Sequence, residues 1–238
     1  MKLLPLVAAL AASVFAMPVW AQNADVEEVV VTGSRMVDWD PDDVPVVQLA
    51  RRADNLIISV RVVNDTREAA GRRSEITQTL RAMAQGAAAR SDIDLSIEDD
   101  GLLVPFNEDM VSTLTLGVDT GRSDTSVAVF VVKTPIRPGD TLDAASGRIE
   151  TFVKAIPKTG RSLADVYGDW QLSIFDPPQY RPAIIAAIAA DARSTSQAFG
   201  DGYAVQVEGM SNRVTWRQSG PLELSLFIPY DMTVTPRL

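Results

Sequence analysis

The sequence predicts an α+β fold, in which helices pack on a mixed, mostly antiparallel sheet and a flexible tail precedes the folded part. From about residue 54, short runs of alternating apolar and polar residues are interleaved with three longer stretches whose apolar residues recur at helical spacing. Before that point, an acidic segment interrupted by proline has the composition of a linker. Strand and helix patterns interleaved in this way are typical of helices layered on one sheet.

The first 21 residues have the order of a secretory signal peptide. Lys2 supplies a positive charge, residues 3–15 form an apolar run, and Val19 and Ala21 occupy the positions that signal peptidase reads. The apolar run of about 13 residues is shorter than the roughly 20 that a membrane-spanning helix needs. We therefore expect residues 1–21 to be a cleavable signal peptide; an N-terminal anchor or a buried helix is the alternative.

This signal predicts export to the periplasm of a Gram-negative cell envelope. The residue after the expected cut is Gln22 rather than Cys, which argues against the lipid attachment of a bacterial lipoprotein. No later stretch approaches about 18 uncharged apolar residues, so no transmembrane segment is expected. The formal net charge of −9 disfavours binding to nucleic acid or to anionic lipid.

Residues 22–53 are predicted to be the flexible tail, and residues 54–238 the folded α+β domain. The tail begins with a β-prone run over residues 26–35 that is broken at Gly33. Residues 38–45 then form an acidic linker that contains Pro41 and Pro45.

The first half of the domain predicts four strands and one helix. Residues 56–63 alternate as a strand, and Asn64-Asp65 with Glu68 resembles a capping box that starts a helix ending near Ala89. Residues 93–97 predict a strand that ends in an acidic turn at 98–101, and residues 113–118 and 126–133 predict two strands joined by a turn at Gly121. The expected buried residues of the helix are Ala69, Ile76, Leu80, Met83 and Ala87.

The second half predicts two helices and three strands. Helices are expected to start at residues 138–140 and 176–178, the second of them ending at Gly200. Strands are expected at 170–175, 203–208 and 222–230, with a short segment around 214–216. The expected inward residues of these helices are Leu142, Ala145, Ile149, Phe152 and Ile156, then Ile184, Ile185, Ile188, Ala192 and Phe199.

The chain contains no histidine and no cysteine. Their absence excludes Ser-His-Asp and Cys-His catalysis, disulfides, thiolate metal sites and nearly every zinc, copper or non-haem iron site. No nucleophile or phosphate-binding motif is present either. We therefore predict no catalytic residues, no metal and no cofactor.

The third predicted helix carries a family resemblance. Residues 181–193, followed by Ala198-Phe199-Gly200, resemble the late helix of the SIMPL-domain family, in which an A-x-x-D-A-R helix ends in glycine and leads into closing strands. Asp54-Asn55-Leu56 and the following strand and helix resemble the opening of that family, so the resemblance covers about residues 53–234. It implies an exported envelope protein that is often oligomeric, is linked to stress tolerance and lacks a demonstrated catalytic centre. An unrelated α+β domain is the alternative.

The tail carries a second resemblance. Residues 27–35, with the sequence EEVVVTGSR, are similar to the TonB box near the mature N-terminus of TonB-dependent outer-membrane receptors. Such a box binds TonB by adding itself as a strand to an exposed sheet edge. The resemblance implies that Val29, Val30 and Val31 supply the backbone pairing and that Glu28 and Thr32 frame the register. A chance β-prone tail without a partner is the alternative.

A receptor itself is not expected, because a 22-stranded barrel needs over 200 residues for its strands alone. We predict a non-enzymatic periplasmic protein that binds partners or self-assembles as a homo-oligomer, with a tail that pairs with TonB. The rival is an envelope enzyme that uses carboxylate or tyrosine chemistry in a cleft. A deep cleft holding two of four residues would favour the enzyme; these are Asp169, Asp176, Tyr180 and Asp191.

Overall fold

The computed structural model of the chain describes residues 28–31, 45–99 and 102–237. The predicted signal peptide and the linker over residues 38–44 lie outside these residues. The α+β prediction is confirmed: three α-helices pack with strands whose pairings, within the described residues, are all antiparallel. No helix of this described part is long and apolar enough to span a bilayer.

The largest sheet has the strand order β1-β8-β3-β7-β4-β5, and β6 pairs with β7 beside that path. Its long central strands are β8, β3 and β7, which explains why most of the apolar side chains of the domain gather around them. The strands are β1 (Glu28–Val31), β8 (Ser162–Phe175), β3 (Asn55–Asn64), β7 (Arg122–Pro135), β4 (Asp94–Asp99), β5 (Leu102–Pro105) and β6 (Gly117–Asp119).

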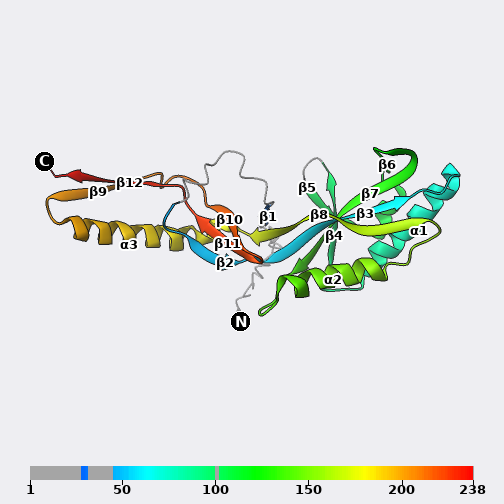
Figure 1. Cartoon of the computed structure of the whole chain (residues 1–238), viewed down its shortest axis with the longest axis horizontal. Helices are drawn as coiled ribbons and strands as arrows, with labels where there is room; N and C mark the ends of the chain where they lie inside the picture. Colours follow the sequence, from blue (N-terminus) through cyan, green and yellow to red (C-terminus); the bar gives the residue numbers. More distant parts are fainter. Residues whose placement is uncertain (1–27, 32–44, 100–101, 238) are drawn as a thin grey trace, which may run out of the picture.

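Helices α1 (Ala69–Ala88) and α2 (Leu142–Ala155) pack against the central strands at one end of the molecule (Figure 1). Their apolar stripes meet the inward residues of β3 and β7, so that Val60, Phe130 and Ile149 are completely buried. Thr141 caps α2, since its side-chain oxygen accepts a hydrogen bond from the Ala144 N–H at 3.2 Å. A 3₁₀ helix, η2 (Glu108–Ser112), packs against α1.

A second core lies on the other side of Trp170, which packs against both cores. It is enclosed by a three-stranded sheet in the order β10 (Thr215–Gly220), β11 (Glu223–Phe227), β2 (Leu49–Arg52), together with the end of β8 and the start of α3 (Arg181–Phe199). Its buried residues include Leu172, Ile174, Ile184, Ile188, Leu224 and Leu226.

The remaining elements form an arm at the opposite end from α1 and α2 (Figure 1). A short 3₁₀ helix, η3 (Pro177–Tyr180), leads into α3, which packs on a two-stranded sheet of β9 (Tyr203–Glu208) and β12 (Asp231–Pro236). We use "arm" below for α3, β9 and β12 together.

Several sequence predictions of local structure were wrong. Residues 113–116 form a turn and a loop after η2, and only residues 117 and 118 belong to a strand, the short β6. Strand β8 begins at Ser162 rather than at Trp170. The capping box is absent, because Asn64 is buried at the end of β3 and α1 begins five residues later, at Ala69. Phe199, predicted to point inward, is 54% exposed, since the arm has no second layer at that position.

The predicted tail also contains folded elements. Residues 49–52 form β2, which pairs with β11, and residues 28–31 form β1, which pairs with β8. The folded part therefore starts earlier in the chain than residue 54, because both short strands find sheet edges that are built by distant residues.

Candidate strand-addition site

The TonB-box-like segment is brought to the edge of the largest sheet. Residues Glu28–Val31 form β1, an antiparallel strand on the last four residues of β8. The register pairs Glu28 with Phe175, Val29 with Ile174, Val30 with Ser173 and Val31 with Leu172. Of the predicted site, Glu28, Val29, Val30 and Val31 therefore share one strand, whereas Thr32 lies outside the described residues.

The end of β8, with which β1 pairs, is held in place by buried side chains and by hydrogen bonds on its other side. Leu172 and Ile174 are buried in the second core, and Ser173 between them is also buried. β3 pairs with β8 on the opposite side. The Ser173 carbonyl oxygen accepts a hydrogen bond from the Asp54 N–H at 2.9 Å, and the Phe175 N–H donates to the Asp54 carboxylate at 2.8 Å. These two bonds join the end of β8 to Asp54 on one side, and its other side pairs with β1.

The same bonds determine which backbone groups of β1 face β8. Successive residues of a strand direct their N–H and C=O groups to alternate sides. Since Ser173 and Phe175 direct theirs towards Asp54, Leu172 and Ile174 direct theirs towards β1. It follows that the backbone groups of Val29 and Val31 face β8, and that those of Val30 face away from it.

β1 is the terminal strand of its sheet, so its outer side is not paired with a strand in the described part of the chain. Part of β10 lies close to β1 without joining its ladder. A terminal strand with unpaired backbone groups is a place where another chain can add a strand.

The four residues named for the enzyme alternative do not meet in one cleft. Asp169 is exposed on β8, Asp176 has a left-handed backbone (φ 44°) before η3, and Tyr180 lies under the Arg51 guanidinium at 5.0 Å. Asp191 lies near Tyr230, where burial first and this carboxylate second raise the pKa of the Tyr230 phenol. A raised pKa keeps the phenol protonated near neutral pH, so that Tyr230 has even less phenolate to act as a base there.

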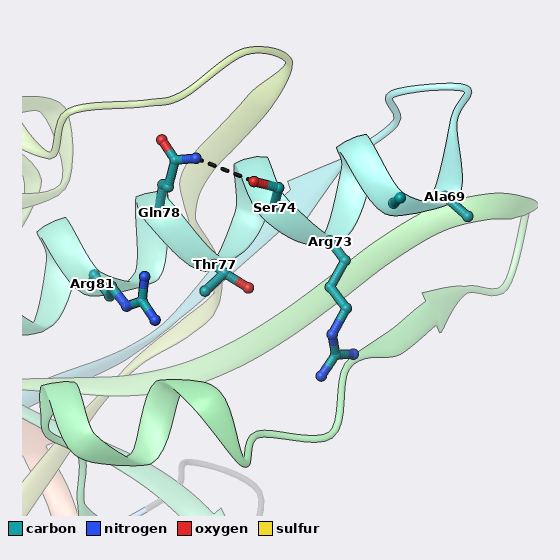
Figure 2. Close-up of a pocket in the computed structure, with 7 residues that line it drawn as sticks. Ala69, Arg73, Ser74, Thr77, Gln78 and Arg81 are labelled. Atoms are coloured by element: carbon teal, nitrogen blue, oxygen red, sulfur yellow. Dashed lines mark hydrogen bonds between the residues drawn. The ribbon is translucent and has the colours of Figure 1, made fainter.

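Two surface hollows are lined by acidic residues, Asp94 and Glu108 in one and Asp140, Asp143 and Glu223 in the other. Two further hollows have a different lining. One hollow follows the exposed face of α1, and Figure 2 shows its lining, which includes Arg73, Arg81 and a hydrogen bond from Gln78 to Ser74 of 3.2 Å. Another lies beside η3, where the Arg181 guanidinium already donates to the carbonyl oxygens of Met210 and Asn212. Neither hollow is lined by a carboxylate or a tyrosine.

The strongest charge cluster joins the end of β3 to α1. Asp65 accepts hydrogen bonds from Arg161 at 2.6 and 2.9 Å and from Arg122 at 3.0 Å, and these guanidinium groups hold the pKa of Asp65 well below its usual range. Glu75 accepts from the Thr66 hydroxyl, which lowers its pKa as well. Both carboxylates stay ionised, so this cluster fastens elements together and supplies no proton donor near neutral pH.

No group of three or more acidic side chains among the described residues is arranged to hold a metal ion. Comparison of the chain with family models, with curated proteins and with solved structures finds no match in any of the three. The resemblances to SIMPL domains and to the TonB box therefore stay predictions from the sequence. β1 and the edge of β8 together are the candidate strand-addition site.

Proposed function

We propose that this chain is an exported, non-enzymatic periplasmic protein that binds a partner by strand addition, with residues 27–35 as the added strand and TonB as the partner. One observation supports this proposal above the others: residues 28–31 form a strand added to a sheet edge, which is what a TonB box does on its partner. The resemblance of residues 27–35 to such a box selects TonB.

Two routes to the partner follow from the backbone directions. In the first, β1 leaves β8 and pairs with an edge of TonB. In the second, β1 stays on β8 and TonB adds to its outer side, where the backbone groups of Val30 point. We favour the first route, because β1 is held by only four residue pairs and its backbone bonds can be exchanged for similar ones on the partner.

The test is binding of residues 22–238 to the periplasmic C-terminal domain of TonB, measured by titration calorimetry. A Val29→Pro/Val30→Pro variant lacks donors on both sides of the strand and should lose binding. A Val37→Pro/Asp38→Pro variant carries the same change in the linker and should bind like the unaltered chain. Failure of the unaltered chain to bind, or equal binding by the first variant, would refute the proposal.

A disulfide distinguishes the two routes. Val30 and Ser173 face each other as a non-hydrogen-bonded pair, the geometry in which side chains of antiparallel strands lie closest. Because the chain has no cysteine of its own, a Val30→Cys/Ser173→Cys variant has no competing thiol. We expect the oxidised variant not to bind TonB and the reduced variant to bind it. Binding by the oxidised variant would instead support addition to the outer side of β1.

A further inference from the structure

The arm is an incomplete layer. In the described part of the chain its sheet has two strands, and α3 packs mainly on β9. Met232 and Val234, on the apolar face of β12, stay partly exposed. The exposed aromatic rings of Phe199 and Tyr203 lie at the tip of the arm, with 5.9 Å between their centroids. Two-stranded sheets are marginal in water, so an arm of this kind gains stability from further strands.

β12 has one free edge, and its backbone directions are known. The Arg237 N–H donates to the Gly202 carbonyl oxygen at 2.8 Å, so the backbone groups of Arg237 face the β9 side. By alternation, the N–H groups of Met232 and Val234 face the free edge, as does the carbonyl group of Pro236.

We propose that a second copy of this chain pairs with this edge, with β12 of one copy antiparallel to β12 of the other. A two-fold axis then passes between the two Val234 residues. In this register each Val234 faces the other, and Met232 faces Pro236 of the second copy on the apolar side. Thr233 faces Thr235 of the second copy on the polar side. The two arms then form one four-stranded sheet with α3 of each copy on the same face.

Charge complementarity selects this register. It places Asp231 of each copy directly opposite Arg237 of the other, at both ends of the paired strands. Within one chain, Asp231 faces Glu208 across the β9–β12 ladder, and like charges in this position repel. Arg237 is exposed and forms no ion pair with any described residue. The second copy therefore supplies the cation that this acidic pair lacks.

The composition of the edge also fits a closed pair of strands. Val234 of each copy donates to Val234 of the other, and Met232 donates to the Pro236 carbonyl oxygen of the other copy. Pro236 has no N–H, so it returns no bond to the Met232 carbonyl oxygen of the other copy, and the ladder between the two copies ends at this pair. Thr233 and Thr235 form the β-branched cross-strand pairs that stabilise antiparallel sheets.

A charge exchange tests the proposal by light scattering and sedimentation of residues 22–238. The unaltered chain should be a dimer. Asp231→Arg alone places two basic residues opposite each other, and Arg237→Asp alone places two acidic residues opposite each other, so each variant should dissociate about tenfold more readily. A one-to-one mixture of the two variants should recover dimers, because every opposing pair is again of opposite charge.

The mixture also distinguishes charge repulsion from misfolding, because a misfolded variant would not form dimers with the other variant. Circular dichroism and TonB binding of both variants should be unchanged, since the arm and β1 are separate sites. A monomeric unaltered chain at about 100 µM, or a mixture no more dimeric than either variant alone, would overturn the proposal.

Cysteine cross-linking tests the register itself. Thr233 faces Thr235 of the second copy, so an oxidised mixture of Thr233→Cys and Thr235→Cys chains should form covalent dimers. Each variant alone should form far fewer, because identical positions are offset along the strands. Equal cross-linking of each variant alone, or none in the mixture, would contradict the register.

Discussion

At the scale of single residues, charged side chains fasten the end of the largest sheet to α1. Asp65 bridges Arg161, just before β8, and Arg122 of β7, while Glu75 of α1 accepts from the Thr66 hydroxyl at 2.5 Å and from the Asn64 side chain at 2.9 Å. Gly160 makes this approach possible: its φ is +57°, and an added Cβ would lie 2.1 Å from the Glu75 carboxyl carbon. Distant parts of the chain therefore meet at one small polar cluster.

This cluster predicts how stability depends on pH. The folded pKa of Asp65 lies below the unfolded value of about 3.9, so its stabilisation is present above about pH 4 and is lost as the pH falls through the folded pKa. Asp65→Asn should lower stability at pH 7 and flatten the decline between about pH 4 and pH 2. Urea unfolding at a series of pH values measures this.

Asp169→Asn is the matched control, because Asp169 is an exposed carboxylate of β8 outside the cluster. It should leave the profile as it is in the unaltered chain. An unchanged profile for Asp65→Asn would show that Asp65 does not link folding to protonation.

At the scale of elements, α3 differs between its two halves. Ile184 and Ile188 in the first half are buried in the second core. The second half packs only on the two-stranded sheet of the arm and ends in the exposed Phe199. The glycine that follows, Gly200, ends the helix with φ at +82°. The stability of α3 therefore depends mainly on its first half.

Substitutions along α3 should show this difference. Ile188→Ala removes a buried side chain and should cost about 2–5 kcal/mol of unfolding free energy. Phe199→Ala removes a larger side chain that is mostly exposed, and in a monomer it should cost far less. Chemical unfolding followed by circular dichroism measures both. A larger effect at Phe199 would show that the second half of α3 is packed more tightly than its exposure indicates.

At the scale of the whole molecule, the two cores share three elements, because β8, β3 and α2 each contribute buried side chains to both. β8 contributes Ala164 to the first core and Leu172 and Ile174 to the second, and Trp170 packs against both. A bulge in the β3–β8 ladder lies beside Trp170, where the register shifts between Ile57 and Ser59. Trp170 is therefore a side chain through which packing in one core can affect the other.

Trp170→Ala should weaken both cores together. We expect a loss of about 2 kcal/mol of unfolding free energy, less than for a fully buried tryptophan, because Trp170 is partly exposed. Hydrogen exchange should quicken for amides of β7 in the first core and of β11 in the second. Tyr167→Ala, on the same strand but 56% exposed, is the control. Faster exchange in only one core would show that the cores are independent.

The elements that could be predicted from the sequence are those whose signals are local. Alternation over residues 56–63 predicted β3, helical spacing predicted α1, α2 and α3, and residues 203–208 were predicted as the strand that became β9. The β-prone character of Val29, Val30 and Val31 predicted a strand that adds to an edge of TonB, and this stays a prediction; in the structure the strand lies on β8 of the same chain. Such patterns depend on neighbours within a few residues, so they can be recognised without the fold.

The edges that these strands meet depend on long-range packing, which local patterns do not indicate. The sequence did not indicate that β1 lies on β8, which comes much later in the chain, because ladder partners are chosen by packing between distant segments. The same reason explains the errors at residues 113–118 and at Asn64, where contacts with distant elements outweighed local preference. The free edge of β12 likewise exists only because α3 and β9 fold back from elsewhere in the chain.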